Sequence, residues 1–189
     1  SAAGEIVGIG GFAAGLVAQG RVGIGKDRDA GDRELGGTFD LAHGPLIRHL
    51  DNLNQIRRYT PDEILFSNSP WFWIGGFGYA LLGTLVAGAR LVCSNAPGAA
   101  DVLDVLERER PTLVNGFAQS VEHLARDASF PRRDLSSIRR GILYPIMPDA
   151  VRPKDPGLRH AMLGMTETGS VCLVSPDEKE LPRISAARS

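Results

Sequence analysis

A hydroxyl and a carboxylate stand side by side near the carboxyl end of the chain. Thr166 and Glu167 lie at the centre of the stretch Leu163–Gly169, which reads LGMTETG. A threonine hydroxyl can donate a hydrogen bond to a phosphate oxygen, and an adjacent carboxylate can hold Mg²⁺. Flanking glycines let the backbone approach a nucleotide closely. The pattern indicates a nucleotide site, and the alternative is an ordinary β-turn that carries a surface glutamate.

Three large aromatic residues precede a pair of glycines in the segment Asn68–Gly76. Trp71, Phe72 and Trp73 are followed by Ile74 and then by Gly75-Gly76. Ligand pockets are lined largely by apolar and aromatic side chains, so this segment could wall an apolar ligand channel. The alternative is that the aromatic rings pack in the core.

A third candidate lies near the start of the chain. Gly8–Ala13 reads GIGGFA and fits the G-x-G-x-x-A pattern of a dinucleotide-binding turn. The surrounding sequence does not fit, because no second strand follows within about 30 residues. A dinucleotide-binding module therefore ranks behind the interpretation of this segment as a flexible leader.

Composition excludes several classes of protein. The chain has 189 residues with 21 Lys and Arg against 22 Asp and Glu, a net charge of -1, which argues against nucleic-acid binding through a basic face. Cys93 and Cys172 cannot form a disulfide framework or a multi-cysteine zinc site, which favours a reducing, cytoplasmic location. The uncharged run from Ile6 to Gly20 is shorter than the ~20 residues of a transmembrane helix, so we expect no membrane span.

Short apolar segments alternate with amphipathic ones along the middle of the chain. This alternation is typical of parallel strands joined by helical crossovers, and it predicts an α/β fold. Strands are expected at 63–67, 90–94, 112–115, 141–146 and 159–163, and helices at 45–56, 74–87, 99–110 and 121–125. By composition, residues 1–40 are expected to be a Gly-rich, poorly ordered leader, residues 41–180 the α/β part, and residues 181–189 a tail.

Taken in order, these segments resemble a fatty-acid–CoA ligase (acyl-CoA synthetase) of the adenylate-forming, AMP-binding superfamily. Leu163–Glu167 resembles the family's aromatic-Gly-x-Thr-Glu motif, and Pro70–Gly76 resembles its Pro-x-x-His/aromatic-x-x-Gly segment. The resemblance runs from about Leu41 to Glu180. The other similar segments are LAH at 41–43, LGTLVAGARLV at 82–92, RPTLVNG at 110–116 and LSSIRRG at 135–141.

The resemblance implies an incomplete form of the family's large N-terminal domain and a two-step reaction. A fatty acid and ATP give an acyl-adenylate and pyrophosphate, and CoA then displaces AMP to form acyl-CoA. It further implies that Thr166 contacts the AMP phosphate, that Glu167 holds Mg²⁺ and that Trp73 stands between the nucleotide and acyl pockets. The remaining implied site residues are Leu163, Gly164 and Met165 for the nucleotide and Gly75 and Gly76 for the acyl chain.

Departures from the family pattern predict weak or absent activity of the chain alone. The family's phosphate-binding loop ends in Pro-Lys-Gly, whereas Glu34–Asp40 lacks the lysine and most of the hydroxyls. Leu163 replaces the aromatic residue that would stack on adenine, Tyr144–Pro148 replaces a Gly-Gly-Ala stretch, and the family's ribose-binding Asp and C-terminal domain would follow Glu180. Loss of a single oxyanion-type donor removes roughly 3 kcal/mol of transition-state stabilisation.

A second hypothesis comes from a different class of function. A fragment that opens a parallel sheet leaves strand edges and an apolar helix uncovered. Such a chain could be a non-catalytic partner that pairs with a complementary polypeptide from a neighbouring reading frame.

Overall fold

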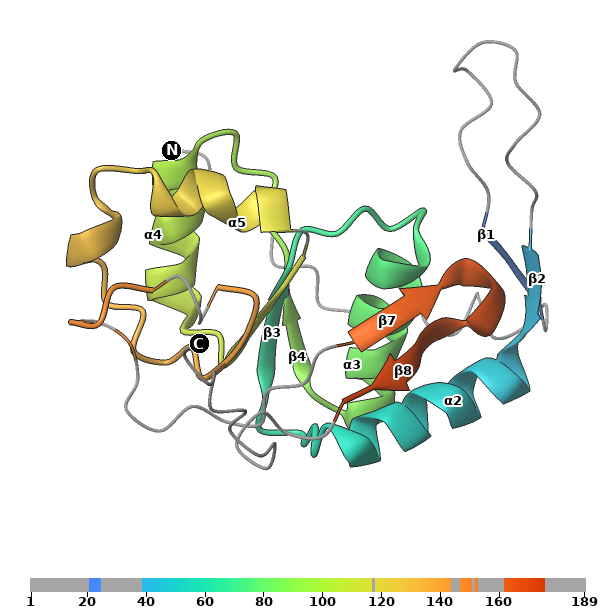
Figure 1. The fold of residues 1–189 in the computed structure, drawn as a ribbon. Coiled ribbons are helices and arrows are strands. Elements are labelled where there is room, and N and C mark those ends of the chain that lie inside the picture. The colour runs from blue at the N-terminus through green and yellow to red at the C-terminus, as the bar shows by residue number, and fades with distance from the viewer. Residues whose placement is uncertain are drawn as a thin grey trace, which may run out of the picture.

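Four parallel strands form the central sheet of the computed structural model (Figure 1). The structure describes residues 21–24, 39–116, 118–143, 147–150, 152 and 162–175. The strand order is β4-β3-β5-β6, and each neighbouring pair is parallel. The α/β prediction is therefore confirmed. The strands are β3 (Ile64–Ser67), β4 (Arg90–Val92), β5 (Leu113–Asn115) and β6 (Arg140–Gly141).

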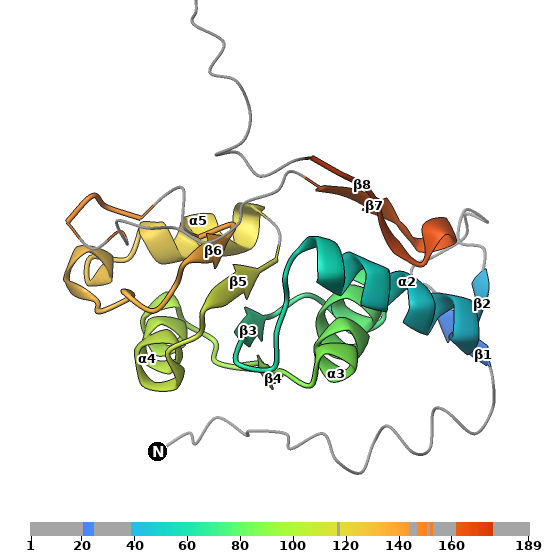
Figure 2. The ribbon, with the colours of Figure 1, turned by 90° about the horizontal axis from the view of Figure 1, so that it is seen from below.

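Apolar side chains project from both faces of this sheet, because successive residues of a strand point to opposite sides. Leu65, Leu91 and Leu113 pack with Tyr59, Phe77 and Leu81 on one face. Phe66, Val92 and Val114 pack on the other face with Leu103, Leu106, Leu124 and Phe130. Figure 2 shows helices on both sides of the sheet. Covering helices on both faces explain why the strands read as short continuous apolar runs.

One face is covered by a continuous pair of helical segments, η2 (Gly75–Leu82) and α3 (Gly83–Ala87), and helix α2 (His43–Ile56) packs against these two segments. Pro45 lies in the first turn of α2, where its missing N–H costs nothing. The sequence predicted a single helix over 74–87, but η2 is a π-helix, which has wider turns than an α-helix. All residues from Gly76 to Leu81 are buried, so no polar side revealed the helical period.

The other face is covered by α4 (Ala99–Glu109), α5 (Ala118–Ala125) and the 3₁₀ turn η3 (Phe130–Arg132). Helix α4 ends at Arg110, which adopts a left-handed conformation with φ of 48°. Pro111 follows and has no N–H with which to continue the helix. The predicted helices at 99–110 and 121–125 are thus both present.

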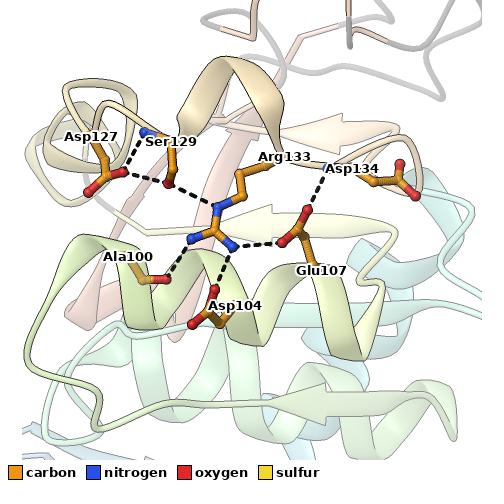
Figure 3. A network of polar contacts seen from close by, with 7 residues as sticks. All are labelled: Ala100, Asp104, Glu107, Asp127, Ser129, Arg133 and Asp134. Carbon is orange, nitrogen blue, oxygen red and sulfur yellow. Dashed lines mark hydrogen bonds and ion pairs between the residues drawn. The ribbon is translucent and has the colours of Figure 1, made fainter.

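Arg133 fastens the segment after η3 to helix α4 (Figure 3). Its Nη1 donates to Glu107 Oε2 at 2.7 Å and to the carboxylate of Asp104, and its Nε donates to Ser129 Oγ at 2.9 Å. The hydrogen bond from Arg133, with a second from the Asp134 N–H, lowers the pKa of Glu107. The guanidinium of Arg133 therefore joins helix α4 to the segment after η3, although helix α5 lies between them in the sequence.

Two antiparallel hairpins accompany the central sheet. Strand β1 (Arg21–Ile24) pairs with β2 (Phe39–Ala42), although β1 lies in the segment 1–40 for which no strand was expected. Strand β7 (Met162–Met165) pairs with β8 (Ser170–Val174) through the 3₁₀ turn η5 (Thr166–Thr168). The sequence predicted a strand at 159–163 but not its antiparallel partner.

Several expectations concern residues that the structure does not describe. They are the GIGGFA motif at 8–13, the tail at 181–189 and residues 144–146 of the predicted strand at 141–146. Within the described part of the chain, no helix has the length and apolar character to cross a membrane.

Candidate functional site

A pocket of about 880 Å³ lies between the central sheet, η2 and the β7–β8 hairpin. None of its described lining residues carries a charged side chain. The described lining residues are Ser69, Trp73, Ile74, Gly75, Tyr79, Asn115, Gly116, Ile142, Met162, Gly164, Met165, Thr166, Ser170 and Val171.

The carboxyl ends of three strands supply the floor of the pocket. Ser69 follows β3, Asn115 and Gly116 end β5, and Ile142 follows β6. Because parallel strands all end at one edge of the sheet, residues from distant segments meet there, and ligands of open α/β sheets bind at this edge. No role was expected for Asn115, although its place at the end of a predicted strand was a usable signal.

The aromatic segment and the start of η2 form the apolar wall. Trp73 lines the pocket with its side chain 42% exposed, and the ring of Phe72 packs edge-on against it with ring centroids 5.7 Å apart. Gly75 also lines the pocket, and a Cβ placed there would meet no atom within 4 Å. Trp73 and Gly75 thus line the same pocket, and their predicted contact with an acyl chain stays a prediction.

Gly76 does not line the pocket. A Cβ on this residue would lie 2.2 Å from the backbone oxygen of Pro70, well inside van der Waals contact. The missing side chain lets the loop before η2 pass directly over the helix. The structure therefore gives Gly76 a packing role, and its predicted contact with an acyl chain stays a prediction.

The β7–β8 hairpin supplies the opposite wall. Gly164, Met165 and Thr166 line the pocket, and the side chain of Thr166 is half-buried. The structure thus brings Thr166 and Trp73, which are far apart in the sequence, to the same pocket.

Glycines hold this hairpin close to the helices beneath it. A Cβ at Gly78 of η2 would lie 3.3 Å from the backbone oxygen of Gly169. Gly169 has φ of +76°, a conformation that favours glycine, and a Cβ there would lie 3.2 Å from Leu46 Cδ1 of α2. A Cβ at Gly78 would also lie 2.8 Å from Ile74 Cδ1, so both glycines stand where the helices and the hairpin pack closely.

Two predicted site residues lie outside the described pocket wall. Leu163 is paired with Leu173 across the hairpin, and both side chains are more than half exposed, at 55% and 62%. Glu167 is exposed in the same turn as Thr166. Met162 and Gly164 on either side of Leu163 line the pocket, whereas Leu163 is not among the described lining residues, so its predicted place beside a nucleotide base stays a prediction.

The described residues contain no group of three or more His, Cys, Asp or Glu side chains that could hold a metal ion. Mg²⁺ is commonly bound through one or two carboxylates together with substrate phosphates. Glu167 fits that mode, since it is an exposed carboxylate next to a pocket residue and forms no ion pair with another described residue.

Comparison with known sequences identifies related proteins. Residues 41–187 match the model of a family described as AMP-binding enzyme. Feruloyl-CoA synthases from an Amycolatopsis species and from a Streptomyces species are each 33% identical to the chain over 140 residues. The match covers 71% of this chain and 28% of each relative, so the chain spans little more than a quarter of their length.

Solved structures share the arrangement of strands and helices. A long-chain-fatty-acid CoA ligase from Rhodopseudomonas palustris matches with a TM-score of 0.64 and 20% identity, over 82% of this chain and 38% of that one. The anthranilate CoA ligase AuaEII, in complex with anthranoyl-AMP, matches with a TM-score of 0.63 and 18% identity, over 75% of this chain and 29% of that one. At these identities the likeness shows the fold.

Proposed function

Because the chain belongs to the AMP-binding enzyme family and has the fold of the N-terminal domain of adenylate-forming enzymes, we propose that it carries the substrate pocket of a fatty-acid–CoA ligase. In this reaction a carboxylate oxygen attacks the α-phosphorus of ATP and pyrophosphate leaves. The thiol of CoA then attacks the acyl carbon of the adenylate and AMP leaves. The proposed location is the cytoplasm.

The observation that carries this proposal is that Thr166 and Trp73 line one pocket. A hydroxyl on the hairpin wall can donate to a phosphate oxygen. The opposite wall presents aromatic and small apolar groups, which suit the acyl part of the substrate. The pocket therefore has a polar side and an apolar side, as a site for an acyl-adenylate requires.

Glu167 is the proposed carboxylate for Mg²⁺. When bound between a carboxylate and phosphate oxygens, the ion neutralises charge on the phosphates. Glu167 follows Thr166 directly in η5, and its exposed side chain lies next to the pocket residue that would contact the phosphate.

A fatty acid is the proposed substrate, and an aromatic acid is the competing one. The described lining supplies apolar contacts and no charged side chain, which suits an alkyl chain. The curated relatives are feruloyl-CoA synthases, which favours a planar aromatic acid. A direct comparison of hexadecanoate with ferulate in the same assay separates the two.

Weak activity of the chain alone is also part of the proposal. Glu34–Asp40 lacks the lysine that the family's phosphate-binding loop carries. Without this cation, less charge is stabilised on the transferred phosphate.

Calorimetric titration with AMP and Mg²⁺ tests the site directly. We expect wild-type protein to bind AMP, Glu167→Ala to lose the dependence on Mg²⁺, and Thr166→Ala to bind AMP more weakly. Glu122→Ala and Thr60→Ala, at exposed positions outside the pocket, are the matched controls. Equal affinity in all five proteins would refute the assignment. ATP–pyrophosphate exchange at the rate of an intact ligase would refute only the prediction of weak activity and would leave the assignment of the site in place.

An exposed apolar surface supports a second candidate function. Leu163, Met165 and Leu173 of the hairpin are exposed by 55%, 46% and 62%. As a non-catalytic partner, the chain would bury these side chains against a complementary polypeptide. Light scattering of the purified chain tests this candidate, because a stable, well-folded monomer over a wide range of concentration would count against it.

A further inference from the structure

The described pocket wall has no positive charge, although the ligands of the proposed function are anions. Its polar groups are the hydroxyls of Ser69, Tyr79, Thr166 and Ser170 and the amide of Asn115. A carboxylate that leaves water for such a pocket loses solvation that neutral hydroxyls and amides only partly replace. A cation close behind the wall would compensate for this loss.

Arg57 is a cation in such a position. It is 5% exposed, and no described residue accepts a hydrogen bond from its buried Nε or Nη1. No carboxylate among the described residues forms an ion pair with it. A buried charge without an ionic partner costs stability, so its presence calls for a reason other than packing.

The guanidinium of Arg57 stacks directly on a pocket residue. Its Cζ lies 4.4 Å from the ring centroid of Tyr79, which lines the pocket, and 4.8 Å from the ring of Tyr59. Arg57 Nη2 donates to Asn54 Oδ1, and Asn54 Nδ2 donates to the oxygen of Gly83 at 2.8 Å. The charge is therefore held rigidly against the ring of a residue that lines the pocket.

The nearest buried acid does not neutralise this charge. Glu63 is bonded to the guanidinium of Arg140 and to the hydroxyl of Thr112, which occupy both of its oxygens. Arg140 in turn donates Nη1 to the backbone oxygen of Arg57 at 2.6 Å. This buried group thus holds two guanidiniums and one carboxylate, and the excess charge is positive.

From this arrangement we infer that Arg57 is a positioning residue, whose buried charge attracts the carboxylate of the ligand into the pocket through the ring of Tyr79. The inference rests on the proposed function for the identity of the ligand as a carboxylate. Charges in a protein interior interact over several ångströms more strongly than in water. A cation behind an aromatic ring can therefore act on an anion in the pocket without touching it.

Carboxylates and their uncharged amides test the inference. We expect Arg57→Met, which keeps a long apolar side chain, to weaken binding of octanoate or ferulate about tenfold, equal to about 1.4 kcal/mol, as measured by calorimetry. Binding of octanamide or ferulamide should be unchanged. Arg57→Lys should retain most of the preference for the carboxylate.

The neighbouring residue supplies a matched control. Arg58 is exposed, so Arg58→Met removes the same charge from the same loop and should leave the ratio of carboxylate to amide affinity unchanged. Equal weakening of acid and amide by Arg57→Met, or an effect of Arg58→Met of the same size, would overturn the inference.

A second measurement needs no ligand. The chain has two tryptophans, so Trp71→Phe leaves Trp73 of the pocket wall as a fluorescent probe. In this background we expect Arg57→Met to reduce quenching by iodide, an anion, relative to quenching by neutral acrylamide. If wild-type protein binds neither acid nor amide, the proposed function fails, whereas a fall in relative iodide quenching still supports the role of Arg57. Unchanged iodide quenching contradicts that role.

Discussion

Glu63 and Arg140 form a buried ion pair that spans strand β5. Their side chains are 7% and 8% exposed. Glu63 precedes β3 and Arg140 begins β6, and these two strands are not neighbours in the sheet. Thr112, which precedes β5, donates to the second oxygen of Glu63. Three neighbouring strands are thus tied together at their amino ends, the opposite edge of the sheet from the pocket.

Removing one member of this pair should destabilise the protein strongly. Arg140→Met leaves the carboxylate of Glu63 buried without its main partner, and we expect a loss of about 3 kcal/mol in the free energy of unfolding. Urea denaturation followed by circular dichroism measures this quantity. Arg139→Met is the control, because Arg139 is half exposed and lies 3.6 Å from the same carboxylate. It should cost less than about 1 kcal/mol, and equal losses would contradict the ranking.

Gly75, which lines the pocket, and its neighbour Gly76, which does not, should respond differently to one added methyl group. Gly76→Ala forces a Cβ against the backbone oxygen of Pro70, and we expect a loss of about 1–3 kcal/mol in unfolding free energy. Gly75→Ala meets open space, so stability should hold while ligand affinity changes. Thermal unfolding and calorimetric titration of both variants distinguish these effects. A stable Gly76→Ala would show that the loop before η2 can move away.

Asp134 should stabilise the folded protein near neutral pH, and this contribution should be lost in acid. Hydrogen bonds from the Ser136 hydroxyl and from Arg110, with a third from the Ser136 N–H, lower the pKa of this carboxyl from 3.8 to about 2. A lowered pKa in the folded state stabilises the protein above pH 3.8, and this contribution disappears as the pH falls toward 2. The melting temperature of Asp134→Asn should therefore fall less than that of wild type between pH 4 and pH 2. Asp62→Asn, at another exposed position, should follow wild type.

Ionisation of Tyr59 should reduce the stability of the folded protein at alkaline pH. Burial raises its pKa to about 12, although the hydrogen bond with Thr84 Oγ1 at 3.1 Å acts in the opposite direction. Because the raised pKa belongs to the folded state, the stabilisation is complete below pH 10 and is lost as the pH rises from 10 toward 12. Tyr59→Phe should show a shallower decline in melting temperature over this range. A decline identical to that of wild type would mean that Tyr59 ionises as freely as in the unfolded chain.

Two features of the site could be predicted from the sequence because each depends on residues that are close together in the chain. The turn that carries Thr166 and Glu167 and the aromatic segment ending at Trp73 could be recognised from residue types and short spacing. Their association in one pocket followed only from the family resemblance. Tyr79 gave no signal, since it lies in a segment that is apolar on every side.

The π-helical geometry of η2 and the antiparallel partner of β7 also escaped prediction. A 3.6-residue period can be read only where polar and apolar sides differ, and η2 has no polar side. Strand β8 pairs with a neighbour in the chain through a three-residue turn, whereas the sequence pattern of the preceding strands predicted helical crossovers.

By itself, the sequence determined the strands of the central sheet and the helices that cover it, because burial on both faces requires continuous apolar strands and amphipathic helices. Only the tertiary structure decided which side chains from the ends of three strands, one helix and one hairpin meet around the pocket. It alone placed Arg57 behind Tyr79, since burial and charge balance depend on contacts between residues that are distant in the chain.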